Sequence, residues 1–441
     1  MRSHRLTRRD FLHGVTAASL VGPLAGRTFG QPRSANQTVN IACVGVGGKG
    51  GSDLRETSVG HNIVAICDID ENTLTGAAEL FPKARKYTDW RKLLEQSDID
   101  AVTISTPDHM HAPVTVSAMQ LGKHVFTQKP LTHNVYESRC MAEIAADKGL
   151  VTQMGIQHHA TARLKLAVHA IQDGVIGPVS EVHAWTDRPG TFWKQGLTRP
   201  DHSDPVPAHV HWDEWLGVAP ERPYVTGLYH RFHWRGWWDF GTGALGDMGC
   251  HLLDPVVNAL ELGPPSTVRA EGPEPNPESG PLECIVHYDF PGTKHTTDNV
   301  HVVWYEAGKQ PPRELFQAPD DWAGSQNGVL YVGEKGNLFV GFPEMPELFP
   351  QEKYADYQWP EIEDHNHYTE WTSAIIGEGK TSCPFSYSGP LTETVLLGNV
   401  AFRTGETIHW DSENLKATGC QAADRFLREE YRPGWEVDGL S

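Results

Sequence analysis

Residues 41–51 read Ile-Ala-Cys-Val-Gly-Val-Gly-Gly-Lys-Gly-Gly, an apolar run that leads directly into a glycine-rich turn. The apolar part predicts a strand over residues 39–44. Gly45 permits a tight turn, Gly47 lets the backbone approach a pyrophosphate, and Gly50 lets the next helix pack close to the sheet. The N-terminus of that helix presents unpaired N–H groups to the phosphates. The candidate dinucleotide contacts here are Gly45, Gly47, Gly48, Lys49 and Gly50.

A second apolar stretch, residues 62–68, ends in Asp68, eighteen residues after Gly50. An acidic residue at this point accepts a hydrogen bond from a ribose hydroxyl. No basic residue follows Asp68 directly, and a carboxylate repels a 2′-phosphate, so the pattern favours NAD over NADP. The alternative is a glycine-rich turn in another kind of α/β protein.

Apolar strands and amphipathic helices alternate from residue 39 to residue 155. The expected strands are 39–44, 62–68, 99–105, 124–127 and 151–154, and the expected helices are 50–58, 71–80, 89–96, 111–121 and 134–148. Alternation at this spacing predicts βαβ units and a doubly wound parallel sheet, hence an α/β Rossmann domain.

The pattern changes after Gly155. A helix at 162–173 is followed by strands at 179–185, 283–289 and 299–305, with long loops between them, and helices return at 365–376 and 391–403. Widely spaced strands joined by long loops predict a mostly antiparallel, open-faced sheet with flanking helices, an α+β domain.

The N-terminus carries a targeting pattern. Thr7-Arg8-Arg9-Asp10-Phe11-Leu12 precedes a mildly apolar stretch with small residues, which is typical of a twin-arginine signal. We expect export by the Tat translocase to the periplasm or cell envelope; the alternative is a disordered basic tail. The expected division of the chain is a signal peptide at 1–30, a linker at 31–37, a Rossmann domain at 38–156 and a substrate and oligomerisation domain at 157–441, whose helices 365–403 pack back on the first domain.

Composition narrows the range of partners. The net charge is −19, which disfavours binding to nucleic acid or to anionic membranes, and no internal apolar run is long enough to span a bilayer. Seven cysteines without a Cys-x-x-Cys motif predict reduced thiols rather than a zinc ribbon or a disulfide framework.

Two clusters of polar residues follow predicted strands of the first domain, at the edge where open α/β sheets place their ligands. One cluster ends the strand 99–105 and the other ends the strand 124–127. Lys129 could donate to a substrate hydroxyl, anchor the nicotinamide ribose or relay a proton, whereas the plain alternatives are helix caps and a solvated lysine. Further candidate cofactor contacts are Ser105, Thr106, Pro107, His111, Gln128 and Lys129.

The stretch 246–254 holds Asp247 and His251, four residues apart. On a helix they share one face. A carboxylate beside an imidazole orients the ring and supports its protonated form, as general acid–base catalysis requires. The alternative is a capped helix whose histidine is satisfied by the aspartate.

Residues 185–238 are rich in aromatic and histidine side chains, which suit a carbohydrate-lined cleft, a hydrophobic core or a subunit interface. These residues are Trp185, Trp193, Trp212, Trp215, Trp234, Trp237, Trp238, His202, His209, His211, His230 and His233. The histidine spacings permit zinc, but no acidic or cysteine ligand with signature spacing joins them, so we expect no bound metal.

Together these motifs resemble the Gfo/Idh/MocA oxidoreductases, the relatives of glucose–fructose oxidoreductase and inositol dehydrogenase. The resemblance rests on the glycine turn, Ala65–Asp68, Ser105–Pro107, Gly122–His124 with Lys129-Pro130, Gly246-Asp247 with His251, and Ala401–Gly405. It implies a Rossmann domain followed by an open-faced sheet, assembly as a homodimer or homotetramer, and catalysis by Lys129, Asp247 and His251. One departure is Gln128, where the family usually has a glutamate that would help to hold Lys129 charged.

The resemblance implies an NAD-dependent oxidoreductase acting on a CH–OH group of a sugar, cyclitol or glycoside. Candidate substrate contacts are Lys129, Gln157, Trp193, Trp237, Asp247 and His251. Export implies a tightly retained cofactor, because no free nicotinamide pool exists outside the cytoplasm. One alternative is redox-neutral glycoside hydrolysis or elimination through a transient keto-sugar, and another is a non-catalytic protein that binds or senses sugars with NAD bound.

Overall fold

The first sheet is built around β1 (Asn40–Val44), the strand that precedes the glycine turn. This computed structural model describes residues 37–342 and 344–441, so the expected signal peptide and nearly all of the linker lie outside the described residues. Six parallel strands run in the order β3-β2-β1-β4-β5-β6. The chain reverses its direction of winding between β1 and β4, which opens a crevice at the carboxyl ends of these two strands.

The other strands of this sheet are β2 (Asn62–Cys67), β3 (Arg85–Tyr87), β4 (Ala101–Ile104), β5 (His124–Thr127) and β6 (Thr152–Met154). Its helices are α1 (Lys49–Thr57), α2 (Glu71–Leu80), α3 (Trp90–Leu94), α4 (His111–Gln120) and α5 (Val135–Asp147), with a 3₁₀ turn η2 (Asp108–Met110). The sequence missed β3, because this three-residue edge strand is polar and shows no alternation of apolar residues.

The second sheet has nine strands in the order β13-β12-β11-β7-β10-β9-β8-β14-β15. They are β7 (Val179–Trp185), β8 (Thr267–Glu271), β9 (Ile285–Pro291), β10 (Thr296–Tyr305), β11 (Gly328–Gly333), β12 (Gly336–Gly341), β13 (Pro346–Phe349), β14 (Ile408–Asp411) and β15 (Lys416–Thr418). Neighbouring strands are antiparallel except β7 and β10, which are parallel. The predicted fold class is therefore confirmed.

The helices of the second domain are α6 (Ala162–Gln172), α7 (Trp212–Leu216), α8 (Gly243–Leu252), α9 (Asp254–Leu260), α10 (His367–Ile375), α11 (Phe385–Thr404) and α12 (Asp424–Leu427). Short 3₁₀ turns are η3 (His233–Gly236), η4 (Arg313–Phe316), η5 (Gln351–Tyr354) and η6 (Gln421–Ala423). Helix α11 begins six residues before the predicted start at 391 and contains Pro390; the prediction failed here because a proline normally marks a helix boundary.

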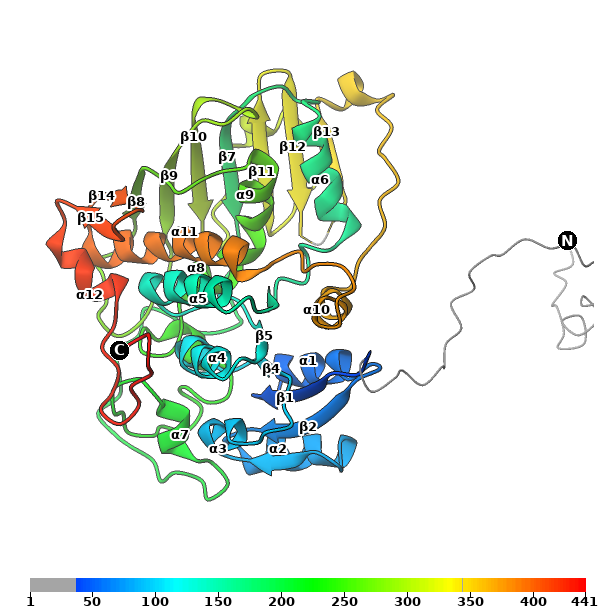
Figure 1. Ribbon diagram of the computed structural model, residues 1–441. Helices are drawn as coiled ribbons and strands as arrows, with labels where there is room; N and C mark the ends of the chain where they lie inside the picture. Colours follow the sequence, from blue (N-terminus) through cyan, green and yellow to red (C-terminus); the bar gives the residue numbers. More distant parts are fainter. Residues whose placement is uncertain (1–36, 343) are drawn as a thin grey trace, which may run out of the picture. The chain divides into compact units, whose positions relative to one another are not determined.

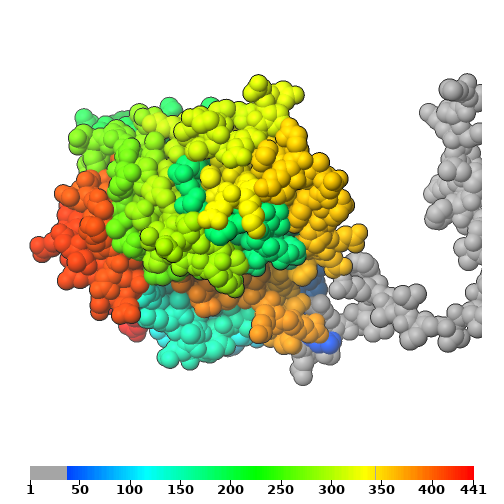
Figure 2. Space-filling view, turned by 90° about the horizontal axis from the view of Figure 1, so that it is seen from above, coloured from blue at the N-terminus to red at the C-terminus, as the bar shows by residue number. Residues whose placement is uncertain are grey.

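Helices α10 and α11 lie between the two sheets (Figure 1), and α11 packs on α5 and α8. Helix α10 packs on α1, and Tyr368 and Trp371 of α10 join one apolar cluster with Ile41 and Phe126 of the first sheet. In the space-filling view the orange residues of this C-terminal part lie directly against cyan residues of the first domain (Figure 2). The last third of the chain therefore helps to form the core of the Rossmann domain.

The two faces of the large sheet are covered differently. One face packs against α8, α9 and α11 through a large apolar cluster that includes Val182, Val286 and Tyr331. Part of the other face is covered by the segment 307–327, which contains η4 and places Phe316 against Trp185. This segment therefore covers a small second core.

All seven cysteines are free and buried. Burial raises the pKa of the Cys43 and Cys250 thiols to about 12.

Within the part of the chain that the structure describes, no helix combines the length and apolar character needed to cross a membrane.

Trp371 is fully buried and lies edge-on to Phe126, with ring centroids 5.7 Å apart. Trp371→Ala is expected to lower the free energy of unfolding by about 3–5 kcal/mol, because the cavity it leaves cannot collapse fully. Urea denaturation followed by circular dichroism measures this. Trp359→Ala, at a half-buried position, is the control and should cost clearly less; equal losses would contradict the docking role of α10.

Candidate active site

A cavity of about 600 Å³ runs from the glycine turn to α8 and is lined by residues of both domains. Most of the side chains singled out from the sequence lie in its wall. These are Gly45, Gly47, Gly48, Lys49, Asp68, Ser105, Thr106, Pro107, His111, Gln128, Lys129, Gln157, Asp247 and His251. The crevice between the carboxyl ends of β1 and β4 therefore opens into one cleft. This cleft brings together residues that lie more than two hundred positions apart in the sequence, such as Gly45 and His251.

The glycine turn has the predicted geometry. Gly45 has a φ of +77°, a backbone conformation that residues other than glycine rarely adopt. A Cβ atom on Gly50 would lie 2.0 Å from the carbonyl oxygen of Gly45, so only glycine lets α1 begin this close to β1. Gly50 therefore supports the turn from behind and does not line the cavity.

Asp68 directly follows β2 and lines the cavity. Its two carboxylate oxygens accept hydrogen bonds from the backbone N–H groups of Val46, at 2.9 Å, and Asp70, at 3.0 Å. Burial nevertheless raises the pKa of the Asp68 carboxyl. Each carboxylate oxygen keeps a free lone pair, so Asp68 can also accept a hydrogen bond from a ribose hydroxyl.

The polar groups after β4 divide into free and occupied ones. The buried hydroxyl of Thr106 has no hydrogen-bond partner among residues 37–342 and 344–441, as expected of a group that serves a ligand. In contrast, the ring nitrogens of His111 lie 2.7 Å and 2.9 Å from the carbonyl oxygens of Pro130 and Thr106. His111 thus ties the loop after β4 to the loop after β5. The glycine turn, Asp68 and Thr106 together fit a dinucleotide.

Lys129, Asp247 and Arg235 meet at the other end of the cavity. The Lys129 ammonium donates to the Asp247 carbonyl oxygen at 2.6 Å and to its carboxylate at 3.0 Å, and Arg235 Nε donates to the same carboxylate at 3.2 Å. Burial would raise the pKa of Asp247, but the charges of Lys129 and Arg235 outweigh it and hold the pKa well below its usual range. Asp247 is therefore a permanent carboxylate that fixes two cations.

His251 differs from the prediction. Asp247 and His251 both lie on α8, but Asp247 bonds to Lys129 and Arg235, while the buried Nδ1 of His251 has no hydrogen-bond partner in the described part of the chain. Burial, followed by the charge of Lys129, lowers the pKa of His251 well below its ordinary value. The expected aspartate-supported imidazolium is thus wrong, because the cations next to the ring take the carboxylate. His251 is a neutral imidazole that can accept a proton.

Two predicted substrate contacts lie elsewhere. Trp193 and Trp237 are 2% and 1% exposed, and their indole N–H groups donate to Gln195 and to the carbonyl of Leu228. Both indole rings pack inside the fold. No sequence pattern distinguishes these two tryptophans from the tryptophans of the same segment that line the cavity. The aromatic residues that do line the cavity are Trp90, Trp215, Phe232 and Trp234.

The segment 230–235, which we call the strap, lies in the stretch 185–238 for which a carbohydrate-lined cleft was one interpretation, but its two arginines were not predicted as site residues. At one end Arg231 pairs with Asp70 at 2.7 Å and His230 Nε2 lies 3.2 Å from the same carboxylate. At the other end Arg235 contacts Asp247. The strap of the second domain therefore crosses from the end of β2 to α8 along the cavity wall. No spacing in the sequence signals this crossing.

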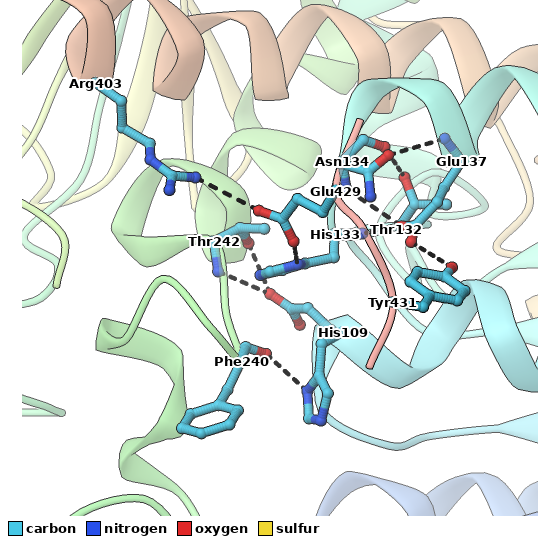
Figure 3. Close-up of polar contacts among 11 residues, drawn as sticks. His109, Thr132, His133, Asn134, Glu137, Phe240, Thr242, Arg403, Glu429 and Tyr431 are labelled. Atoms are coloured by element: carbon cyan, nitrogen blue, oxygen red, sulfur yellow. Dashed lines mark hydrogen bonds and ion pairs between the residues drawn. The ribbon is translucent and has the colours of Figure 1, made fainter. Parts of the chain in front are cut away.

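A polar network supports the loop that follows Lys129 (Figure 3). Glu429 lies between His133 and Arg403, at 2.9 Å and 3.6 Å, while Tyr431 donates to Glu137 at 2.6 Å. Asn134 and Glu137 form a capping box at the start of α5. Burial would lower the pKa of His133, but the Glu429 carboxylate outweighs it and raises the pKa to about 9.

Among residues 37–342 and 344–441, His159, Asp254 and Cys383 bring possible metal-ligand atoms within 4.8 Å of one another. His159 already bonds to Asp254 at 2.8 Å, and the Tyr387 hydroxyl donates to the same carboxylate at 2.6 Å. Protein groups therefore satisfy this cluster. Of the histidines with metal-like spacing, His211 pairs with Glu71 and His230 with Asp70.

Comparison with known proteins gives two family matches. Residues 39–156 match the oxidoreductase family with an NAD-binding Rossmann fold, and residues 163–280 match the C-terminal alpha/beta domain of the oxidoreductase family.

The chain is similar to levoglucosan dehydrogenase of Pseudarthrobacter phenanthrenivorans, with 26% identity over 43% of this chain and 40% of that protein. It is also similar to a glycosyl hydrolase family 109 protein of Shewanella pealeana, with 32% identity over 30% of this chain and 35% of that protein. The matches thus span two fifths or less of these relatives' own lengths. The WlbA dehydrogenase of Chromobacterium violaceum, solved with NADH and UDP-GlcNAcA, shares the fold at a TM-score of 0.60, with 18% identity over 87% of this chain and 99% of that chain.

The His133–Glu429 pair predicts a pH dependence of stability. Because the pKa of His133 is raised from 6.5 to about 9 by folding, its contribution is complete below pH 6.5 and is lost as the pH rises through about 9. Glu429→Gln is expected to cost about 1.5–3 kcal/mol of unfolding free energy near neutral pH and clearly less above about pH 9. Urea denaturation across this range measures the difference, and a constant difference would contradict the assignment.

Proposed function

The chain belongs to the Gfo/Idh/MocA family of oxidoreductases and carries its NAD-binding Rossmann domain, and we propose that it oxidises a CH–OH group of a sugar, cyclitol or glycoside with NAD, or reduces the corresponding carbonyl with NADH. The observation that carries this proposal is the single cavity that joins the glycine turn and Asp68 to Lys129, Asp247 and His251. A dinucleotide site and a set of acid–base groups at opposite ends of one cleft are what hydride transfer to a bound substrate requires.

The roles of the side chains follow from their charges. Bound NAD would supply the hydride acceptor or donor. His251 lines the cavity as a neutral ring, and we assign it the role of accepting the proton of the substrate hydroxyl. Lys129 donates a hydrogen bond to the oxygen as carbonyl character develops, and Asp247 holds that ammonium in place. The roles of Lys129 and His251 are thus separate, with Asp247 as the anchor of Lys129.

The substrate end of the cavity suits a polyhydroxylated ring. Phe232 and Trp234 offer aromatic faces, and the Arg235 guanidinium stacks 4.2 Å and 4.4 Å from their ring centroids. Aromatic faces pack against the apolar faces of sugars, while Arg235 and Gln157 offer hydrogen-bond donors to hydroxyl groups. The printed names of the similar proteins, a levoglucosan dehydrogenase and a glycosyl hydrolase, support a carbohydrate substrate.

We also propose that the cofactor is retained between turnovers and that residues 1–30 direct export. The strap supports retention, because it joins both ends of the cleft through ion pairs. A retained cofactor favours a closed redox cycle. The second candidate is therefore redox-neutral glycoside cleavage through a transient keto-sugar, for which the similarity to a glycosyl hydrolase family 109 protein is the specific support.

The proposal is tested by hydride transfer in two variants. Lys129→Met and His251→Asn are each expected to lower kcat about 100-fold or more, the usual contribution of a positioned acid or base. The ultraviolet band of NADH is followed while a panel of sugars and glycosides is offered, and released product is analysed for a cleaved glycosidic bond. A wild-type protein that holds no dinucleotide and shows no hydride transfer would overturn the proposal.

Retention is tested through the strap. Arg231→Ala removes a charged contact worth about 1 kcal/mol, so bound NAD should leave about five times faster. The release rate is measured by chasing the bound cofactor with an excess of labelled NAD. Arg269→Ala is the matched control, because Arg269 pairs with Glu271 on β8 in the second sheet; equal rates in both variants would contradict the strap's role.

A further inference from the structure

Asp53, in the second turn of α1, is a fully buried carboxylate that does not line the cavity. One of its oxygens accepts from Lys49 Nζ and from the Tyr368 hydroxyl, both at 2.6 Å. The other oxygen accepts from Ser105 Oγ at 2.7 Å and from Gln128 Nε2 at 2.8 Å. An ionised carboxylate has about four acceptor positions, so Asp53 uses all of them.

The four donors come from four separate parts of the chain. Lys49 belongs to the glycine turn, Ser105 follows β4 and Gln128 follows β5, and these three residues line the cavity. Tyr368 comes from α10 and also accepts a hydrogen bond from Lys49 at 2.5 Å. One buried carboxylate therefore sets the positions of three cavity residues and links them to a helix of the second domain.

We propose that Asp53 is the positioning residue of the dinucleotide site, which holds Lys49, Ser105 and Gln128 in the arrangement that binds NAD and couples this arrangement to the docking of α10. This inference rests on the proposed function. Asp53 itself touches no ligand in this scheme. It acts through its partners, since a neutral side chain could not accept from four donors and balance the charge of Lys49.

The contact between Asp53 and Gln128 is set sterically as well. The Gln128 side chain lies against the backbone of Gly155, where a Cβ atom would come within 2.6 Å of Nε2. Gln128 is therefore confined between Gly155 and Asp53. The residue after it is Lys129, so displacement of the Gln128 side chain would also disturb the proposed catalytic lysine.

The amide–carboxylate pair allows a reciprocal exchange as a test. Gln128→Glu places a second carboxylate at hydrogen-bond distance from Asp53, and two such groups must share a proton. Asp53→Asn removes the charge that Lys49 requires. The double variant D53N/Q128E restores one carboxylate and one amide in the same contact, with their positions exchanged.

The release rate of bound NAD, chased with labelled NAD, is measured for these three variants, with Asp100→Asn as the control. Asp100 accepts from the backbone of Asn40 at the exposed start of β1, so this control should behave as wild type. We expect D53N and Q128E to release NAD about 10- to 100-fold faster, as for loss of hydrogen bonds to a charged group. The double variant should recover to within about threefold of wild type.

Q128E carries a signature that a merely structural role would not produce. Its NAD release should slow as the pH falls from about 8 to about 6, because the shared proton is then bound, whereas release from the wild type should not change in this way. If D53N fails to fold, the release rate of NAD from Q128E and its dependence on pH still test the inference. Folded variants that release NAD at the wild-type rate would overturn this inference while leaving the proposed function intact; a wild type without NAD would overturn both.

Discussion

The pairing of Asp247 with both Lys129 and Arg235 is the contact on which the rest of the site depends. It joins the loop after β5, the strap and α8, so the relative position of the two domains and the geometry of the acid–base groups are set together. Removing one member would leave a charge without its partner in a desolvated wall. Burial, and after it the charge of the Lys129 ammonium held by this pairing, lowers the pKa of His251 and keeps its ring neutral.

Much of the first domain could be predicted from the sequence, because its determinants are local. The glycine spacing, the apolar runs and the acidic residue after the second strand all lie within about thirty residues of sequence. The structure places Gly45, Asp68 and Thr106 around one cleft. The carboxyl ends of parallel strands must share an edge, so residues after β4 and β5 were also brought together correctly. The short polar strand β3 was missed for the same reason: it carries no local signal.

The partners of the charged side chains could not be predicted, because they come from distant segments. Helical spacing suggested that Asp247 serves His251, yet Lys129, which lies 118 residues away, takes the carboxylate. Gln128 was predicted as a cofactor contact and noted as a departure from a family pattern, but its contact with Asp53 depends on how α1 packs on the sheet. Among seven tryptophans in one segment, Trp215 and Trp234 line the cleft whereas Trp193 and Trp237 do not, although all four are buried, and only the fold decides which of them reach the cleft.

The burial of all seven thiols shields them from reagents in the solvent while the protein is folded. Thiolates, rather than thiols, react with peroxides and maleimides, and a pKa of about 12 at Cys43 and Cys250 leaves almost no thiolate near neutral pH. Such reagents can therefore attack only after local opening of the fold. Formation of a disulfide between any two of these buried cysteines would require the fold to open in the same way.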